Sequence, residues 1–284
     1  MFELFCKQPV YFHINFWLFI ICSLIVFALC LLPARRQSYL KGSVSLPALP
    51  LTGNPRFPAT SDQLLTVAYL ALIIWLYGLP QLPKEAVESA QKTPTDDNTA
   101  NIVSAWVGML IPVFLYTPLI IKYICSHFCI PRLSLKSICY VFVGLGIIYT
   151  ASNILDKTGF FHWLIDITGT PAEQSSVQYI KENAYKAVII PTALSVIVVA
   201  PIVEELFFRG FIFSTLNQRV STPIAAVFSG ILFGAIHFSL AQTIILSIFG
   251  VVQCYLYRHT GSILYPILLH FIFNSLAFIT IINM

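Results

Sequence analysis

The sequence predicts an all-α fold, a polytopic membrane protein with about eight transmembrane helices in a single membrane domain spanning residues 1–284. Hydrophobic residues make up 57% of the chain and charged residues only 10%, whereas a soluble domain is about 45–50% apolar and about 25% charged. The apolar residues also gather into long runs, and about 20 of them in a helix cross the hydrocarbon core of a bilayer. This pattern is typical of an integral membrane protein.

Eight apolar runs are the expected membrane helices, and polar or turn-forming segments separate them. The first run is long and lacks small residues at a credible cleavage site, so we expect a helix and not a signal peptide. The sixth run is short, which favours a tilted helix or one covered by its neighbours. In chain order the runs are Phe12–Leu32, Leu64–Leu82, Ile102–Cys125, Ser137–Leu155, Ala187–Phe208, Ile224–Phe238, Ala241–Tyr257 and Ile263–Ile282.

The loop charges set the expected orientation, because Lys and Arg near the membrane favour the cytoplasmic side. Basic residues mark loops 33–63 and 122–136 and the turns with Arg219 and Arg258, whereas loops 83–101 and 156–186 are mainly acidic. We therefore expect an integral protein of a bacterial cell (inner) membrane with both termini outside.

Loop 156–186 also carries an apolar and aromatic patch, Phe160, Phe161, Trp163 and Leu164. Such a patch suits a short helix that lies on the membrane surface. We expect this helix on the outer face.

Polar residues inside the predicted membrane helices are the most unusual feature of the chain. The run PIVEELFFRG carries Glu204, Glu205 and Arg209. A charge at that depth costs on the order of a few kcal/mol, so a membrane protein that keeps one usually uses it. The later apolar runs add His237, His270 and Asn274. We interpret the set as an active site.

Helix geometry separates the two glutamates. Glu205 and Arg209 are spaced i,i+4 with the acid first, the favourable order for an ion pair. Glu204 points about 100° away on the same helix. We expect Glu205 with Arg209 to support the site and Glu204 to be free for chemistry.

The hairpin turns place the other polar groups at comparable depths. Glu204 and His237 each lie about 16–17 residues, or about 25 Å, from a midpoint near Val220, so we expect them to meet. His270 and Asn274 lie one helical turn apart on one face, about 12–20 Å from the cytoplasmic turn that precedes them. All four are expected to line one cavity that opens toward the cytoplasmic half of the membrane.

Gly230 and Gly234 form a GxxxG pattern close to His237, which is typical of helices whose backbones approach closely. We expect the partner to be the helix that carries Glu204.

These residue types point to hydrolysis. A carboxylate held in apolar surroundings suits a general base, and an adjacent imidazole can share a water with it. His270 and Asn274 are hydrogen-bond donors suited to a developing oxyanion. Such a site needs no serine or cysteine nucleophile.

Three motifs resemble those of the CPBP family, the CAAX proteases and bacteriocin-processing enzymes, also called the Abi family. EExxxR appears as Glu204 to Arg209, FxxxH as Phe233 to His237, and HxxxN as His270 to Asn274. The resemblance covers about 187–275, the expected catalytic core helices, and departs from the family at Cys254, where members often have a small glycine.

The resemblance implies a glutamate-dependent intramembrane protease. In that family pattern Glu204 and His237 activate water, His270 and Asn274 stabilise the oxyanion, and Glu205 and Arg209 support the site. The implied substrate is a peptide or a lipidated protein. We expect membrane lipids to surround the chain and expect no nucleic-acid partner.

Other functions remain open at this point. Glu204, His237 and His270 could supply the His₂Glu ligand set of a catalytic zinc, although we expect no cofactor and no metal. A transporter or proton relay also uses intramembrane acids and histidines, but no inverted repeat supports it. A non-catalytic immunity or scaffold protein could keep the same pocket.

Overall fold

The computed structural model describes residues 10–30, 32, 134–169, 186–237 and 239–283. These residues belong to one compact unit of the chain, formed by 1–38 and 108–284. The second unit, Tyr39–Val107, lies outside the described residues, and so do the predicted runs Leu64–Leu82 and Ile102–Cys125.

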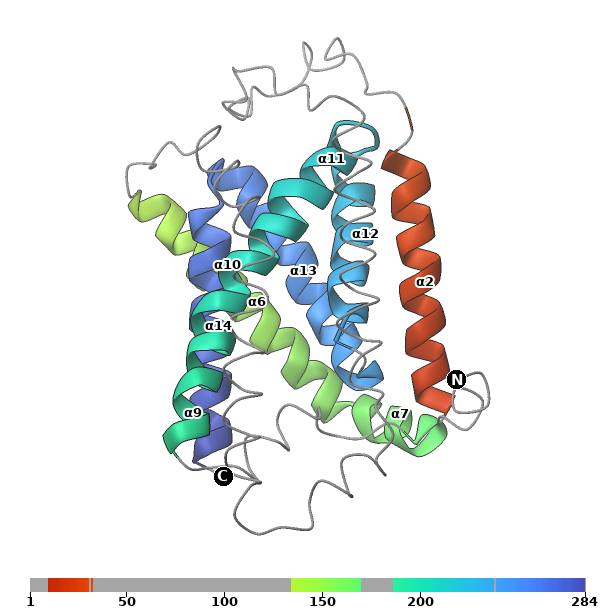
Figure 1. The fold of residues 1–284 in the computed structure, drawn as a ribbon, viewed down its shortest axis with the longest axis vertical. Helices are drawn as coiled ribbons and strands as arrows, with labels where there is room; N and C mark the ends of the chain where they lie inside the picture. Colours follow the sequence, from red (N-terminus) through yellow and green to blue (C-terminus); the bar gives the residue numbers. More distant parts are fainter. Residues whose placement is uncertain (1–9, 31, 33–133, 170–185, 238, 284) are drawn as a thin grey trace. The chain divides into compact units, whose positions relative to one another are not determined.

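Regular structure within the described residues is entirely helical, without a strand (Figure 1). The elements are α2 Val10–Cys30, α6 Leu135–Lys157, α7 Phe160–Thr168, α9 Lys186–Ala193, η2 Leu194–Val199, α10 Ala200–Glu205, η3 Leu206–Phe213, α11 Ser214–Asn217, α12 Thr222–Ala235, α13 Leu240–Thr260 and α14 Leu264–Ile282, where η marks π-helical turns.

Each predicted run that falls within the described residues forms a helix. Three of these helices, α6, α13 and α14, are long and apolar enough to cross a membrane, while α12 and the Phe16–Cys30 part of α2 are shorter apolar helices. The all-helical class is therefore confirmed for the described residues. The total of about eight spans stays a prediction.

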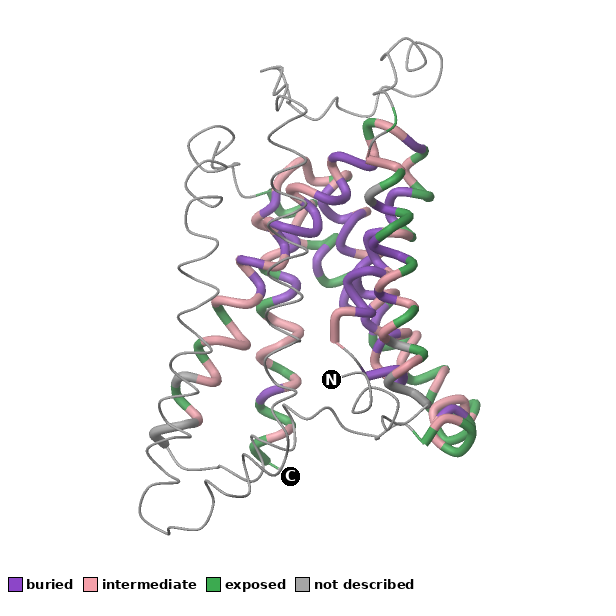
Figure 2. The backbone as a smooth tube through the Cα atoms, turned by 45° about the vertical axis from the view of Figure 1, so that its right-hand side comes forward, coloured by how far each residue is buried: buried purple, intermediate pink, exposed green. Residues whose placement is uncertain are grey.

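Helices α12 and α13 form the centre of the packing. α12 contacts α13 and α2, and α13 also contacts α6 and α14. Figure 2 shows the buried residues gathered along the facing sides of the helices. α12 is short, as expected, and these neighbours cover it.

The outer faces of the helices are apolar as well. Along α6, Val141 and Ile148 are buried, yet Phe142 and Ile147 on the other face are 62% and 50% exposed. A helix that is apolar on both its packed and its exposed face suits a lipid environment.

Glycine allows α12 and α13 to approach closely. A Cβ at Gly234 would overlap the carbonyl oxygen of Thr243, and a Cβ at Gly230 would lie 2.7 Å from the carbonyl oxygen of Ser247. From the opposite side, a Cβ at Gly250 would lie 2.7 Å from the Gly230 Cα. Backbone therefore packs on backbone along this contact.

The expected partner of the GxxxG pattern is thus wrong, because the pattern faces α13 and not the helix with Glu204. The glutamate-bearing helix meets α12 through aromatic rings instead, with the ring centroids of Phe208 and Phe233 5.1 Å apart. Rings of this size keep two backbones apart, whereas Gly250 on α13 does not.

The predicted surface helix is present as α7. Gly159 and Gly169, with φ of 72° and 66°, bound it at its two ends, a conformation that glycine adopts without steric cost. Leu164 is buried against Leu240 and Ala241 of α13, while Trp163 is 55% exposed. Its position on the outer membrane surface stays a prediction.

The glycine contact predicts a sharp positional difference. Gly234→Ala should lower the free energy of unfolding by about 1–3 kcal/mol because α12 and α13 must separate. Gly146→Ala on α6 is the matched control, since a Cβ there meets nothing within 4 Å. Thermal unfolding of the two purified variants in detergent measures the difference, and equal midpoints would contradict the close contact.

Candidate active site

The helix that carries the glutamates is interrupted twice by π-helical turns. Glu204 and Glu205 end the 6-residue α10, with η2 before it and η3 after it. Such turns are rare and are frequent at functional sites. They shift the register of backbone hydrogen bonds, so some carbonyl groups need other donors.

Pro201 and Asn274 explain how the first interruption is stabilised. In a π-helical register each N–H pairs with the carbonyl five residues earlier, as the Ala200 N–H does with the Ser195 carbonyl. Pro201 follows and has no N–H, so it offers nothing to the Val196 carbonyl. The Asn274 Nδ2 of α14 donates to that carbonyl at 2.8 Å.

Serine hydroxyls act in the same way at the second interruption. The Ser229 Oγ of α12 donates to the Phe208 carbonyl at 3.3 Å, and the Ser214 Oγ donates to the Arg209 carbonyl at 2.8 Å. Side-chain donors of this kind satisfy backbone groups where a membrane helix departs from the α register.

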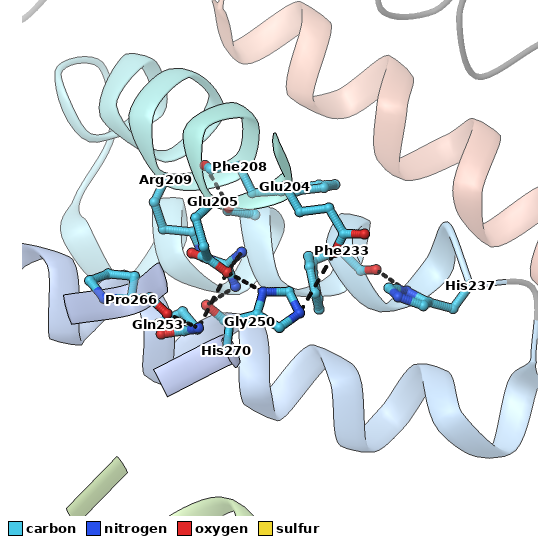
Figure 3. Close-up of polar contacts among 11 residues, drawn as sticks. Glu204, Glu205, Phe208, Arg209, Phe233, His237, Gly250, Gln253, Pro266 and His270 are labelled. Atoms are coloured by element: carbon cyan, nitrogen blue, oxygen red, sulfur yellow. Dashed lines mark hydrogen bonds and ion pairs between the residues drawn. The ribbon is translucent and has the colours of Figure 1, made fainter. Parts of the chain in front are cut away.

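Glu205 is the centre of the polar network (Figure 3). Its Oε1 accepts hydrogen bonds from the Arg209 Nη1 at 2.9 Å, the His270 Nδ1 at 2.9 Å and the Gln253 Nε2 at 3.2 Å. Glu205, Arg209 and Gln253 are fully buried. The ion pair expected from the i,i+4 spacing is therefore present, with two further donors on the same oxygen.

Arg209 is held on two more sides. Its Nη2 lies 3.4 Å from the Gly250 carbonyl oxygen, and its guanidinium lies 4.6 Å from the centroid of the Phe233 ring. The cation–π contact and the ion pair together compensate a charge that has lost its water.

His270 lies between the two glutamates. A carboxylate only accepts, so the His270 Nδ1 carries the hydrogen that it shares with Glu205. The opposite ring nitrogen, Nε2, lies 3.9 Å from the Oε2 of Glu204. The rings of Phe249 and Phe233 pack against the imidazole, with centroids 4.9 Å and 5.8 Å away. The Glu205 bond and these rings fix which nitrogen faces Glu204.

Glu204 differs from its neighbour in both exposure and bonding. Its side chain is 24% exposed, and its buried Oε2 has no hydrogen-bond partner. The Oε2 of Glu205 is also without a hydrogen-bond partner, but it belongs to a fully buried side chain. Because buried carboxylate oxygens are normally satisfied, the partly exposed Glu204 carboxylate is the one open to a water or a substrate.

His237 is oriented from within its own turn. Its Nδ1 donates to the Phe233 carbonyl at 2.9 Å, which leaves Nε2 free to face another group. The Phe233 ring packs against both histidines, with centroids 5.1 Å from His237 and 5.8 Å from His270.

Direct contacts join Glu204, Glu205, Arg209 and His270. No hydrogen bond joins Glu204 to His237, its expected partner, within the described residues. The imidazole nearest to the Glu204 carboxylate there is that of His270. Asn274 makes its contact with Val196 and not with the glutamates. Its expected place in one shared cavity stays a prediction.

Sequence reasoning missed Gln253. It stands in the apolar run LSIFGVVQCYLY, and a polar residue at membrane depth is the same signal that identified the other site residues. Within the described residues no group of three or more His, Cys, Asp or Glu is arranged to hold a metal ion.

A helical bundle with three candidate membrane-spanning helices and a buried network of carboxylate, arginine and histidine defines the class, a helical membrane protein with a buried polar site. Residues 186–276 match the profile of the family "Type II CAAX prenyl endopeptidase Rce1-like", so the resemblance seen in the three motifs is confirmed. The chain is also 27% identical over 217 residues to "Putative membrane peptidase YdiL" of Bacillus subtilis (strain 168). The aligned region covers 72% of this chain and 82% of that protein. No solved structure matches the chain significantly.

The contact between Asn274 and Val196 predicts a coupled pair of substitutions. Asn274→Ala should cost about 1–3 kcal/mol of stability, because the Val196 carbonyl loses its donor. In a Pro201→Ala background the restored N–H can serve that carbonyl, so the same change should cost less.

A double-mutant cycle of thermal unfolding midpoints in detergent measures this coupling. Asn283→Ala is the matched control, since its Nδ2 also donates to a backbone carbonyl, that of Ile279, but far from Pro201 in sequence. Strictly additive effects of Asn274→Ala and Pro201→Ala would refute the register argument.

Proposed function

We propose that this chain is an intramembrane endopeptidase of the CAAX-protease and bacteriocin-processing type, which hydrolyses a peptide bond with an activated water. One observation carries the proposal, namely the contrast between two adjacent glutamates. Glu205 is fully buried and accepts three hydrogen bonds on Oε1, while Glu204 is partly exposed and accepts no hydrogen bond within the described residues. This contrast suits Glu205 to a structural role and Glu204 to general-base chemistry.

In the proposed reaction Glu204 is the general base. Its carboxylate takes a proton from a water that the free Nε2 of His237 helps to position, and the water oxygen attacks the scissile carbonyl carbon. As the C–N bond breaks, Glu204 returns the proton to the leaving amine. No covalent intermediate with the protein forms.

His270 and Asn274 are the proposed oxyanion donors. With its Nδ1 committed to Glu205, His270 has Nε2 for donation toward the carbonyl oxygen. Asn274 has a second Nδ2 hydrogen beside the one given to Val196. Donors held in place before reaction are worth about 2.7–4 kcal/mol each in such sites.

An apolar groove, lined by residues close in sequence to Glu204 and His270, supports a hydrophobic or lipid-anchored substrate. It is lined by Pro201 and Ile202, just before Glu204, and by Ile267 and Phe271, which flank His270 on α14. We assign it to the apolar part of the substrate, which can stay in contact with lipid while the peptide bond reaches Glu204.

The two glutamates give the decisive test. Glu204→Gln should abolish peptide cleavage with only a small effect on stability, because the Glu204 side chain is 24% exposed and its contact with the His270 Nε2 is 3.9 Å long. Glu205→Gln should lower the free energy of unfolding by about 3–5 kcal/mol, because Arg209 is left buried without a counter-ion. Cleavage assays and thermal unfolding on both purified variants check this.

Normal turnover in Glu204→Gln together with an inactive but fully stable Glu205→Gln would reverse the two roles. The same assay with a chelator tests the proposal that no metal takes part. Stoichiometric zinc, with activity lost on chelation and restored on re-addition, would favour a metallohydrolase.

Orientation and substrate class can be tested together in liposomes. We propose that the site opens toward the cytoplasmic half of the membrane, with both termini outside, because Arg219 and Arg258 mark the two adjacent turns as cytoplasmic. Peptides of matched sequence, with and without an apolar or lipid anchor, should be cleaved from the cytoplasmic face and faster when anchored. Equal cleavage of the soluble peptide from the outer face alone would refute both parts.

A further inference from the structure

Gln253 links Glu205 to the backbone of α14, the helix that carries His270. It lies on α13, fully buried, and its Nε2 donates to the Glu205 Oε1 at 3.2 Å and to the Pro266 carbonyl at 3.0 Å. Both partners are acceptors, so the amide must present its nitrogen to them. Figure 3 shows the side chain reaching from its helix toward both.

The Pro266 carbonyl has a particular place in α14. In an α-helix a carbonyl accepts the N–H of the residue four positions later, and that residue is His270. The Gln253 amide therefore contacts the turn of α14 that holds the His270 backbone, and it also contacts the carboxylate that holds the His270 ring.

Stability alone does not account for a glutamine here. The Gln253 Oε1 is buried and has no hydrogen-bond partner, and an unsatisfied buried acceptor is unfavourable. A methionine of similar shape would fill the same space without that penalty, but it would leave Glu205 and Pro266 without the amide donor. What the glutamine adds to packing is therefore the link between these two acceptors.

We propose that Gln253 is a positioning residue for His270, a role that rests on the peptidase function proposed above. Its amide limits Glu205 to the conformation in which Oε1 faces Nδ1 of His270, and it holds the α14 turn at the matching height. The His270 Nε2 then faces Glu204. Without the amide, the imidazole and the carboxylate can each turn, and the donor to the oxyanion is misaligned.

The test compares the full chain with Gln253→Met and with Ser247→Ala as the matched control on the same helix. The Ser247 hydroxyl bonds within its own helix, to the Thr243 carbonyl. Gln253→Met should lower kcat by up to about 100-fold, as misplacement by about 1 Å does, with KM unchanged. Ser247→Ala should leave kcat and KM unchanged.

Nuclear magnetic resonance of ¹⁵N-labelled histidine rings gives a second readout that needs no activity. The His270 ring signals, assigned with a His270→Gln variant, should shift in folded Gln253→Met and stay in place in Ser247→Ala. Unchanged His270 signals, or an unchanged kcat, in folded Gln253→Met would overturn the proposal.

If Gln253→Met does not fold, Gln253→Asn carries the test, since its amide is one methylene too short to reach both acceptors. It should give the same shift and a smaller loss of kcat. Shifted ring signals in a chain that cleaves no peptide would reject the proposed function while leaving the positioning role intact.

Discussion

The buried ion pair between Glu205 and Arg209 is the constraint on which the other polar contacts depend. Removing two charges from water costs several kcal/mol for each ion unless further hydrogen bonds compensate, and hydrocarbon offers none. The compensation comes from other helices: Gln253 and Gly250 from α13 and His270 from α14. An i,i+4 pair on one helix therefore determines which residues of two later helices must lie beside it.

The same pair separates the chemistry of two neighbouring residues. Because successive residues on a helix differ by about 100° in direction, Glu205 can face the packed centre while Glu204 faces its edge. The π-helical turns on either side keep α10 short. They also free carbonyl groups that Asn274, Ser229 and Ser214 then satisfy. The Ser229 and Asn274 bonds tie the segment with the glutamates to α12 and α14.

Local rules explain which features could be predicted from the sequence. Hydropathy located most helices within the described residues to within three positions, and i,i+4 spacing predicted the bond between Glu205 and Arg209. The predicted run Ala187–Phe208 ended too early, because the helical segment continues through η3 and α11 to Asn217. Features that join distant helices were not predictable in this way. The contact of His270 with Glu205, the role of Gln253 and the packing of Gly230 on α13 depend on how helices rotate about their own axes. The bond from Asn274 to Val196 also depends on a π-helical register, which apolar periodicity does not encode.

Charge balance connects the role proposed for Glu204 as general base with the role proposed for His270 as oxyanion donor. Glu205 and Arg209 neutralise each other, so an ionised Glu204 leaves one negative charge at the edge of an apolar interior. A proton on the His270 Nε2, 3.9 Å from the Glu204 Oε2, would balance it. The ionised carboxylate is the form needed for a general base, and the doubly protonated imidazole is the form needed for an oxyanion donor. In the proposed reaction one arrangement of charges therefore supplies both the ionised Glu204 and the protonated His270. It depends on His270 lying between Glu204 and Glu205.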